Sequence, residues 1–378
     1  MLWSFSIGRI AGIAIKVHIT FFLILILGAV QWGQPYGAIG AVYGVVLMIL
    51  LFVCVTLHEL GHSLVAQRFG VAVREIVLLP LGGVALLERN ATKPWQEFLI
   101  AAAGPLVNVV IAILLFGITG AAAAMGNFDG SALQLNSPPS ISAMLVWLLQ
   151  ANIMLVLFNL IPAFPLDGGR MLRATLAMFL SYQRATRIAT TIGQGIAILL
   201  GILGVTSGNF ALELVAVFVF FGAGQEHVEG QARTILQTKR VGDAYNRHAL
   251  TLDIGDRVSR VVDYILTSYQ PDFAVMQGMK LLGIVTRDDV FRALSNEARD
   301  IYVTGIMNRD FVHVPHTATL EEVRTIMMEK QARVVAVYDA DNYLGLVSTE
   351  DISETFAVLA YQERQRQLQV SETKQGSV

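Results

Sequence analysis

The chain has 378 residues, of which 54% are hydrophobic and only 15% are charged, with a formal net charge of −2. Soluble proteins of this size carry about a quarter charged residues, so the composition excludes both an ordinary soluble globule and a disordered chain. The near-neutral charge balance gives no reason to expect a nucleic-acid partner. The single cysteine, Cys54, excludes a disulfide framework and a Cys-rich metal site.

Charged residues are distributed unevenly along the chain. No Asp, Glu, Lys or Arg occurs at 17–57, 98–126 or 131–166. Uncharged runs of this length fit the hydrocarbon core of a bilayer as helices. We therefore expect a polytopic α-helical membrane protein, because the buried helices of a soluble protein would not give so many long runs. The six expected membrane helices lie at about 17–32, 38–66, 97–125, 141–164, 187–206 and 210–226.

Basic residues occur on alternate sides of the expected helices. Arg9 and Lys16 precede the first, and groups of four lie between the second and third and between the fourth and fifth. The other connections, at 31–37, 126–140 and 207–209, contain no Lys or Arg. Because basic loops stay in the cytoplasm, we expect a multi-pass protein of the cell membrane with both termini cytoplasmic. The N-terminal residues lack the pattern of a cleavable signal peptide.

The chain changes character after Glu226 and has the composition of a soluble α/β segment. GIVTRDDVF at 283–291 matches GLVSTEDIS at 345–353, which indicates an internal repeat. A stretch with helical periodicity and then a short apolar strand precede each copy. They lie at 258–267 and 273–276 before the first copy, and at 320–330 and 334–338 before the second. Each copy is expected to fold as helix, strand, turn, strand and helix, and the two copies to pack together.

The expected segments follow from this change in character. They are a membrane domain at 1–228, a linker at 229–240, repeats at 241–300 and 301–360, and a polar tail at 361–378, which we expect to fray.

The second expected membrane helix carries the motif HELGH at 58–62. Residues four apart share one face of a helix, so His58 and His62 can bind one Zn²⁺ while Glu59 holds a water beside it. Ionisable side chains inside a membrane are costly and are functional by default. The motif therefore predicts a catalytic zinc site rather than incidental histidines at a helix end.

A third protein ligand is needed, because two histidines leave a tetrahedral ion incomplete. Asp167, in NLIPAFPLDGGR at 159–170, follows the fourth expected helix on the same side of the membrane as HELGH. Taken alone, Asp167 could simply cap a helix that starts near Gly168. With HELGH present, we expect Asp167 to be the third ligand. The nearby Arg170 and Arg173 are expected to anchor the chain to lipid headgroups.

HELGH together with NLIPAFPLDGG resembles the site-2 protease family of intramembrane zinc metalloproteases, whose second motif is Asn-x-x-Pro-x-Pro-x-Leu-Asp-Gly. The spacing departs from that pattern at Pro165, which follows Pro162 by three residues rather than two. The C-terminal repeat resembles a pair of CBS domains, which some members of that family carry.

The resemblance implies an intramembrane zinc endopeptidase with one Zn²⁺ per chain. Its substrate would be a transmembrane segment of a membrane-anchored protein, cleaved in regulated intramembrane proteolysis. The CBS resemblance implies that ATP or AMP binds the pair and gates the enzyme, and it allows a homodimer formed through the CBS domains.

Two asparagines are candidates for binding the oxyanion that forms on the peptide. The resemblance places Asn159, at the end of the fourth expected helix, near the substrate, and Asn108 in AGPLVN at 103–108 also matches a family pattern. The alternative for both is hydrogen bonding between membrane helices.

The segment at 71–87, VAVREIVLLPLGGVALL, is too interrupted to be a spanning helix. It predicts a β-hairpin or re-entrant loop that turns at 80–83, with Gly82 and Gly83 beside the substrate. An exposed strand edge can pair with an extended peptide, and a peptide bond must leave its helix to be cleaved. An ordinary cytoplasmic linker is the alternative.

Each repeat has a hydroxyl three residues before an aspartate at its strand-to-helix turn: Thr286 and Asp289, and Ser348 and Asp351. Such a turn suits a ribose and its phosphate, with the positive end of the helix dipole nearby. Equally, the two hydroxyls could only cap the helices that follow. The sequence supports a nucleotide site and a pair of caps equally.

Two other functions compete with a protease. A CBS-regulated transporter or channel is disfavoured, because transport has no need of a glutamate between two histidines one turn apart, and the chain shows no clear inverted repeat. An inactive, protease-like scaffold is disfavoured by the presence of Glu59 and Asp167.

Overall fold

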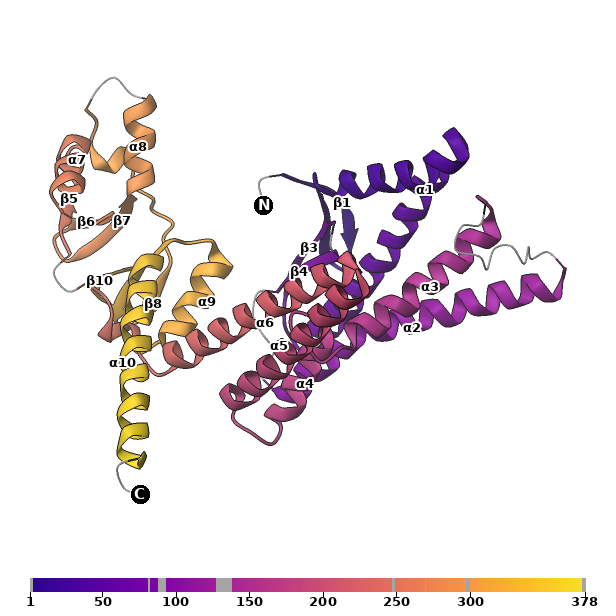
Figure 1. The fold of residues 1–378 in the computed structure, drawn as a ribbon. Helices are drawn as coiled ribbons and strands as arrows, with labels where there is room; N and C mark the ends of the chain where they lie inside the picture. Colours follow the sequence, from indigo (N-terminus) through magenta and orange to yellow (C-terminus); the bar gives the residue numbers. More distant parts are fainter. Residues whose placement is uncertain are drawn as a thin grey trace. The chain divides into compact units, whose positions relative to one another are not determined.

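The computed structural model describes residues 3–80, 82–87, 93–126, 138–246, 249–268, 270–296 and 300–375. The chain divides into two compact units, Met1–Val228 and Glu229–Val378. Figure 1 shows long helices and a small sheet in the N-terminal unit, and short strands with helices in the C-terminal unit.

Long apolar helices make up most of the N-terminal unit. In the described part of the chain, five helices are long and apolar enough to cross a membrane. They are α1 Phe21–Arg68, α2 Pro94–Ala124, α3 Ile141–Asn159, α5 Tyr182–Ser207 and α6 Phe210–Gln237. The short helix α4 (Asp167–Ala177) connects α3 to α5. The first two expected helices, at about 17–32 and 38–66, both fall within α1, and the other four correspond to α2, α3, α5 and α6. The number of membrane crossings stays a prediction.

Helix α1 bends back on itself at Gly37, whose φ of 64° and ψ of −149° interrupt the helix. The two halves lie against each other, since a Cβ atom at Gly44 would overlap the backbone of Gly28. The rings of Phe21 and Phe52 meet edge to face with 4.6 Å between centroids. A straight helix of 48 residues would measure about 72 Å, more than twice the ~30 Å hydrocarbon core, whereas the parts before and after Gly37 measure about 24 and 46 Å.

The crossing of Gly28 and Gly44 sets a size limit that can be tested. Gly44→Val forces the halves of α1 apart, and overpacking of this kind costs about 1–3 kcal/mol. We expect a lower thermal unfolding midpoint in detergent than for wild type. Gly117→Val in α2 is the matched control, because a Cβ atom there meets nothing within 4 Å. Equal midpoints for the two variants would contradict close packing at the crossing.

A four-stranded sheet packs against α1, in the order β1-β2-β3-β4. Its strands are β1 Ser4–Ile10, β2 Ile13–His18, β3 Val73–Leu79 and β4 Gly82–Leu87. Strands β2 and β3 pair in parallel, and the other two pairings are antiparallel. The hairpin expected at 71–87 is thus present as β3 and β4, while its entry into the bilayer stays a prediction.

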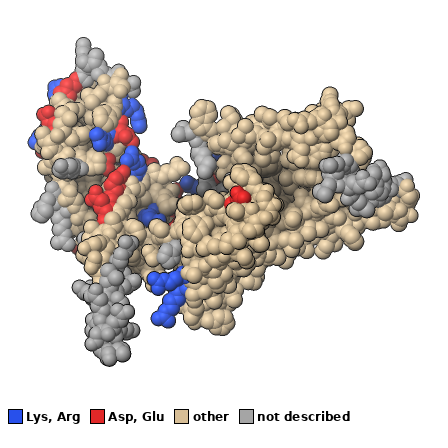
Figure 2. All heavy atoms as spheres, in the orientation of Figure 1, with Lys and Arg blue, Asp and Glu red and all other residues tan. Residues whose placement is uncertain are grey.

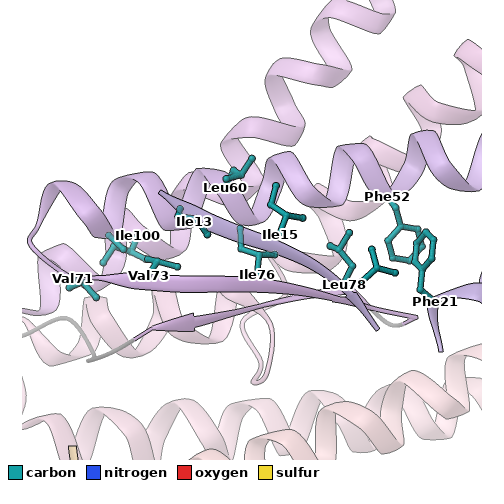
Figure 3. Close-up of a cluster of buried hydrophobic side chains, with 12 residues drawn as sticks. Ile13, Ile15, Phe21, Phe52, Leu60, Val71, Val73, Ile76, Leu78 and Ile100 are labelled. Carbon is teal, nitrogen blue, oxygen red and sulfur yellow. The ribbon is translucent and has the colours of Figure 1, made fainter. Parts of the chain in front are cut away.

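Alternating apolar residues hold this sheet on the helices. Ile13 and Ile15 of β2 and Ile76 of β3 are buried in one cluster with Leu60 of α1, the central residue of HELGH (Figure 3). Strands β1 and β2 were not expected, because the residues before the expected helix at about 17–32 were assigned no secondary structure. The signal for β2 was the alternation of apolar residues along 13–17, which are buried at every second position.

The outer surface of the long helices is apolar. Exposed side chains on α2 include Leu106, Ile113, Leu114 and Phe116. On the face shown in Figure 2, the surface over the long helices is almost free of charge, while charged side chains gather over the C-terminal unit. Apolar surface of this extent requires contact with lipid or with another apolar surface.

The C-terminal unit consists of two similar halves. The first contains β5 Thr251–Asp253, α7 Val258–Thr267, β6 Asp272–Gln277, β7 Lys280–Thr286 and α8 Arg287–Asn296. The second contains β8 His313–Pro315, α9 Leu320–Lys330, β9 Val334–Asp339, β10 Asn342–Ser348 and α10 Thr349–Gln375. The expected order of helix, strand, turn, strand and helix is confirmed in both halves. The parallel strands β5 and β8 were not expected, because three residues are too few to show a period.

The two halves share a hydrophobic core. Ala274 and Ile284 of the first half are buried in one cluster with Ala336 and Leu346 of the second. The expectation that the two copies pack together is therefore confirmed.

Two helices extend beyond the expected boundaries. Helix α6 continues to Gln237, through most of the stretch at 229–240 that was assigned as a linker. Helix α10 continues to Gln375, where the polar composition predicted a fraying tail. Residues 361–375 contain no glycine or proline and are rich in Gln, Glu and Arg, which are good helix formers, so a helix is consistent with this composition; fraying of the tail stays a prediction.

Candidate metal centre

Two imidazoles from one face of α1 converge on one point. His58 and His62 are one helical turn apart, and each is 7% exposed. Their Nε2 atoms lie 3.1 Å from each other. Helix α2 packs against them at Gly104, where a Cβ atom would overlap both Nε2 atoms. The two imidazole rings fit at this point only because residue 104 is glycine and has no side chain.

The other nitrogen of each ring is held by α2. Nδ1 of His62 lies 2.7 Å from the carbonyl oxygen of Ile100, and Nδ1 of His58 lies 2.8 Å from Oδ1 of Asn108. Because both oxygens only accept hydrogen bonds, each Nδ1 donates its proton and each Nε2 presents its lone pair. Hydrogen bonds of this kind fix the tautomer and orientation of metal-binding histidines.

Asp167 completes the donor set. Its Oδ2 lies 3.2 Å from Nε2 of His58 and 3.2 Å from Nε2 of His62. Three atoms that present lone pairs at this separation repel one another unless a cation lies between them. Tetrahedral Zn²⁺ with bonds of about 2.0–2.1 Å separates its ligands by about 3.3 Å, so the three side chains fit this ion.

Residues 160–166, which we call the Asp167 segment, connect α3 to α4 and hold the carboxylate in place. Phe164 is fully buried within this segment. A Cβ atom at Gly168 would overlap the carbonyl oxygen of Leu160, so the start of α4 packs directly on the segment. Helix α4 begins at Asp167 itself, with no side-chain cap, so the alternative role of Asp167 as a capping residue is not observed.

Strand β4 passes beside Glu59. A Cβ atom at Gly83 would lie 2.5 Å from Cγ of Glu59 and 3.4 Å from its Oε1. Gly82, at the start of the same strand, has a φ of 137°, which strongly favours glycine. Among the residues that the structure describes, β4 is an edge strand of the sheet, and Gly83, one of the two glycines expected beside the substrate, lies where this edge passes Glu59.

The two candidate asparagines lie in different surroundings. Asn108 is fully buried, and its Nδ2 donates to Oδ1 of Asn152 at 3.1 Å. Both ends of the Asn108 amide are thus used between helices, in agreement with the alternative of helix–helix hydrogen bonding. Asn159 is the last residue of α3 and is half-buried. Asn152 was not singled out from the sequence, although a polar residue two turns before Asn159 in an apolar helix was a signal.

The expectation that Arg173 anchors the chain to lipid headgroups is wrong. Arg173 is 6% exposed and forms ion pairs with Glu97 of α2 and Glu226 of α6. A guanidinium is tolerated at such depth only when its charge is paired, and here each of its three nitrogens donates to one of the two carboxylates. The available signal was the position of the two glutamates, each at the end of an apolar run.

The contact at Gly104 predicts a loss of metal binding. Gly104→Ala places a methyl group where the two imidazoles converge, so we expect the affinity for Zn²⁺ to fall by at least about 100-fold. Competition with a chromogenic chelator measures it. Gly120→Ala in the same helix is the matched control, since a Cβ atom there meets nothing within 4 Å. If both variants retain wild-type affinity, Gly104 does not shape the site.

A second candidate site is a cavity of about 660 Å³ within the C-terminal unit. Its lining includes the apolar Leu250, Val334 and Leu346 and the hydroxyls of Thr286 and Ser348. Its charged lining residues are Asp272, Asp288, Glu350, Asp351 and Glu354 against Arg287 and Arg333. The cavity can therefore take an aromatic or apolar group beside hydroxyls, in a negatively charged setting.

The two strand-to-helix turns have the same hydrogen bonds. Oδ2 of Asp289 accepts from the backbone N and the hydroxyl of Thr286 at 3.0 and 2.6 Å, and the hydroxyl accepts from N of Asp289 at 3.3 Å. Ser348 and Asp351 repeat this arrangement. The backbone N and the hydroxyl of Ser348 each donate to Oδ2 of Asp351 at 2.7 Å, and N of Asp351 donates to the hydroxyl at 3.1 Å. The reciprocal pairs resemble a capping box, so the hydroxyls do cap α8 and α10.

The turns differ in one neighbour. In the first half, Arg292 lies 3.7 Å from Oδ1 of Asp289. The equivalent residue of the second half is Glu354, which lines the cavity. The matched positions three residues after the two aspartates thus carry a basic residue in one half and an acidic residue in the other.

Comparison with known proteins places these sites in a family context. Residues 46–200 match peptidase family M50, and residues 299–357 match the CBS domain. The chain is 32% identical over 367 residues to zinc metalloprotease MJ0392 of Methanocaldococcus jannaschii. The match covers 96% of this chain and 99% of that protein. It is 27% identical over 189 residues to stage IV sporulation protein FB of Bacillus subtilis, covering 50% of this chain and 57% of that protein. A solved structure, the site-2 protease from Methanocaldococcus jannaschii, is 42% identical with a TM-score of 0.44, covering 60% of this chain and 95% of that one.

Proposed function

Because the chain belongs to peptidase family M50, as a site-2 protease-like zinc metalloprotease with a CBS pair, we propose that it cleaves proteins within the membrane. The proposed substrate is a transmembrane segment of a membrane-anchored protein, cleaved in regulated intramembrane proteolysis. The observation that carries the proposal is the approach of three donor atoms, from His58, His62 and Asp167, among helices with apolar outer surfaces.

Glu59 carries the proton transfer in this proposal. Its carboxylate follows His58 directly in the chain, takes a proton from the attacking water and delivers it to the leaving amine. A zinc ion held by the three donors supplies Lewis acidity toward the water and the scissile carbonyl. We assign Asn159, half-buried at the end of α3, as a donor to the oxyanion. Asn108 instead orients His58, since both ends of its amide are already used.

The edge of β4 is the proposed binding site for the unwound substrate. A substrate helix protects its peptide bonds by internal hydrogen bonds, so the scissile stretch must be bound extended. Pairing with β4 replaces those hydrogen bonds. Because β4 passes Glu59 at Gly83, a peptide paired with this edge lies beside the carboxylate that transfers the proton.

The proposed topology follows the distribution of basic residues. Six membrane crossings, with α1 contributing two, place both termini in the cytoplasm of a cell-membrane protein. HELGH and Asp167 then lie near the cytoplasmic side, where water reaches the donor set. Neither a transporter nor an inactive scaffold explains a buried set of three metal donors with a glutamate beside it.

Substitution of Glu59 tests the catalytic assignment. Glu59→Gln keeps the size of the side chain but removes the base, so we expect zinc content equal to wild type and cleavage of a model transmembrane substrate reduced by at least about 1000-fold. The measurement uses protein purified in detergent, with zinc determined by mass spectrometry and cleavage followed on gels.

The same loss of charge elsewhere serves as the control. Glu213 lies in the first turn of α6, and the variant Glu213→Gln is expected to cleave the substrate as wild type does. Equal cleavage by the Glu59 and Glu213 variants would end the protease assignment.

The cavity in the C-terminal unit is the proposed site of an adenine nucleotide that gates the enzyme. The matched turns present two hydroxyls and two helix N-termini to it. Its excess of carboxylates disfavours polyphosphate, so we propose AMP rather than ATP as the better ligand. Burial, together with the nearby Glu350, raises the pKa of Asp272 to about 6, so Asp272 becomes neutral in mildly acidic solution.

The raised pKa of Asp272 predicts pH-dependent binding. Protonation below about pH 6 removes one negative charge from the cavity, so AMP should bind several-fold more tightly at pH 5.5 than at pH 7.5. Asp272→Asn should bind AMP more tightly than wild type at pH 7.5, and should keep only the pH dependence that comes from the phosphate of AMP, whose second pKa is also about 6. Calorimetry on the full chain with AMP and ATP measures this. An absence of binding heat for both nucleotides at both pH values would remove the nucleotide proposal.

A further inference from the structure

A buried arginine joins three helices next to the metal donor set. Nε of Arg173 in α4 donates to Oε1 of Glu97 in α2 at 2.8 Å, and its terminal nitrogens form ion pairs with Glu97 and Glu226. Glu97 is as buried as the arginine, while the side chain of Glu226 in α6 is 31% exposed. The cation therefore has one fixed partner and one partner at the edge of the packed region.

The guanidinium also contacts the Asp167 segment directly. Its central carbon lies 4.8 Å from the ring centroid of Phe164 and 5.1 Å from that of Tyr182, the first residue of α5. Cation–π contacts of a desolvated guanidinium are among the stronger ones. Phe164 is three residues before Asp167, so Arg173 holds the segment from which the third donor projects.

Helix α6 packs on the same segment. A Cβ atom at Gly222 would overlap the ring of Pro165, and Ala223 is buried in one cluster with Phe164. Val219 is buried with Leu166 in a neighbouring cluster. Positions 219, 222, 223 and 226 share one face of a helix, so one face of α6 carries both the apolar contacts and the ion pair with Arg173.

The other end of α6 belongs to the C-terminal unit. The helix ends at Gln237, beyond the boundary at residue 228. Leu236 is 2% exposed and lies in the core of the second repeat, in one cluster with Val314 and Leu320. A single helix is therefore packed at one end on the Asp167 segment and at the other end in the core of the second repeat.

We propose that Arg173 is a positioning residue for Asp167, and that its ion pair with Glu226 makes α6 the route by which the state of the repeats reaches the metal donor set. The proposal rests on the metal centre of the proposed function. A rotation or shift of α6 moves Glu226 and the small residues against the segment, while Glu97 keeps the other side of the guanidinium fixed. The displacement therefore falls on Phe164 and on the carboxylate beyond it.

The positioning role is tested by the spectrum of Co²⁺ bound in place of Zn²⁺, because visible absorption of Co²⁺ depends on ligand geometry. In the full chain, Glu226→Gln should change the band intensities and weaken Co²⁺ binding by about tenfold. Glu229→Gln, one turn further along α6 and exposed, is the matched control and should leave both unchanged.

A second variant separates positioning from folding. Arg173→Lys keeps the buried charge that Glu97 needs but lacks the planar fork that reaches two carboxylates and stacks on Phe164. It should give the same spectral change as Glu226→Gln while the protein stays folded by circular dichroism. Wild-type Co²⁺ spectra and affinities in both variants would overturn the positioning role.

The route through α6 is tested by hydrogen exchange at 314–337, within the core that contains Leu236. Because coupling between sites is reciprocal, Zn²⁺ bound in the N-terminal unit should slow exchange there in wild type and have no effect in Glu226→Gln. Absence of a zinc effect in wild type would overturn the route. Neither measurement uses proteolysis, so a chain that shows both effects yet cleaves no substrate would refute the proposed function and leave this inference standing.

Discussion

Three lone pairs directed at one point inside an apolar helix bundle are the constraint on which the rest of the structure depends. The imidazoles of His58 and His62 and the carboxylate of Asp167 would repel one another without a cation, so the surrounding packing must force their approach. The backbone of α2 supplies much of that force. Gly104 allows the rings to converge, and the Ile100 carbonyl and Asn108 fix their tautomers.

Several buried polar side chains in the bundle are paired with partners on other helices. The chain of hydrogen bonds from His58 through Asn108 to Asn152 joins α1, α2 and α3. Arg173 joins α2, α4 and α6 in a similar way. Every such partnership fixes the relative placement of helices that apolar contacts alone would leave free to slide, since lipid is as apolar as the side chains it replaces. The positions of the three donors are therefore set by a few polar contacts.

The sequence was sufficient to predict the elements whose signal is local. HELGH was singled out because its two histidines share one helix face inside an apolar run, and Asp167 because two histidines leave a zinc ion short of a ligand. Helices α7 and α9 were predicted at their observed bounds from apolar periodicity. Strands β1 and β2 were missed because the residues before the expected helix at about 17–32 were assigned no element, although apolar residues alternate along 13–17. The role of Arg173 was misjudged for a different reason: its partners, 76 and 53 residues away, are brought to it only by tertiary packing.

The two strand-to-helix turns of the C-terminal unit share one backbone arrangement, yet one aspartate has Arg292 beside it and the other half carries Glu354 at that place. A duplicated module begins with two identical halves and hence with two identical responses to any small molecule. Here two matched positions carry opposite charges: Arg292 pairs with Asp289 in the first half, and Glu354 lines the cavity in the second. The two similar halves therefore differ in the charge that stands one helical turn after the matched aspartates.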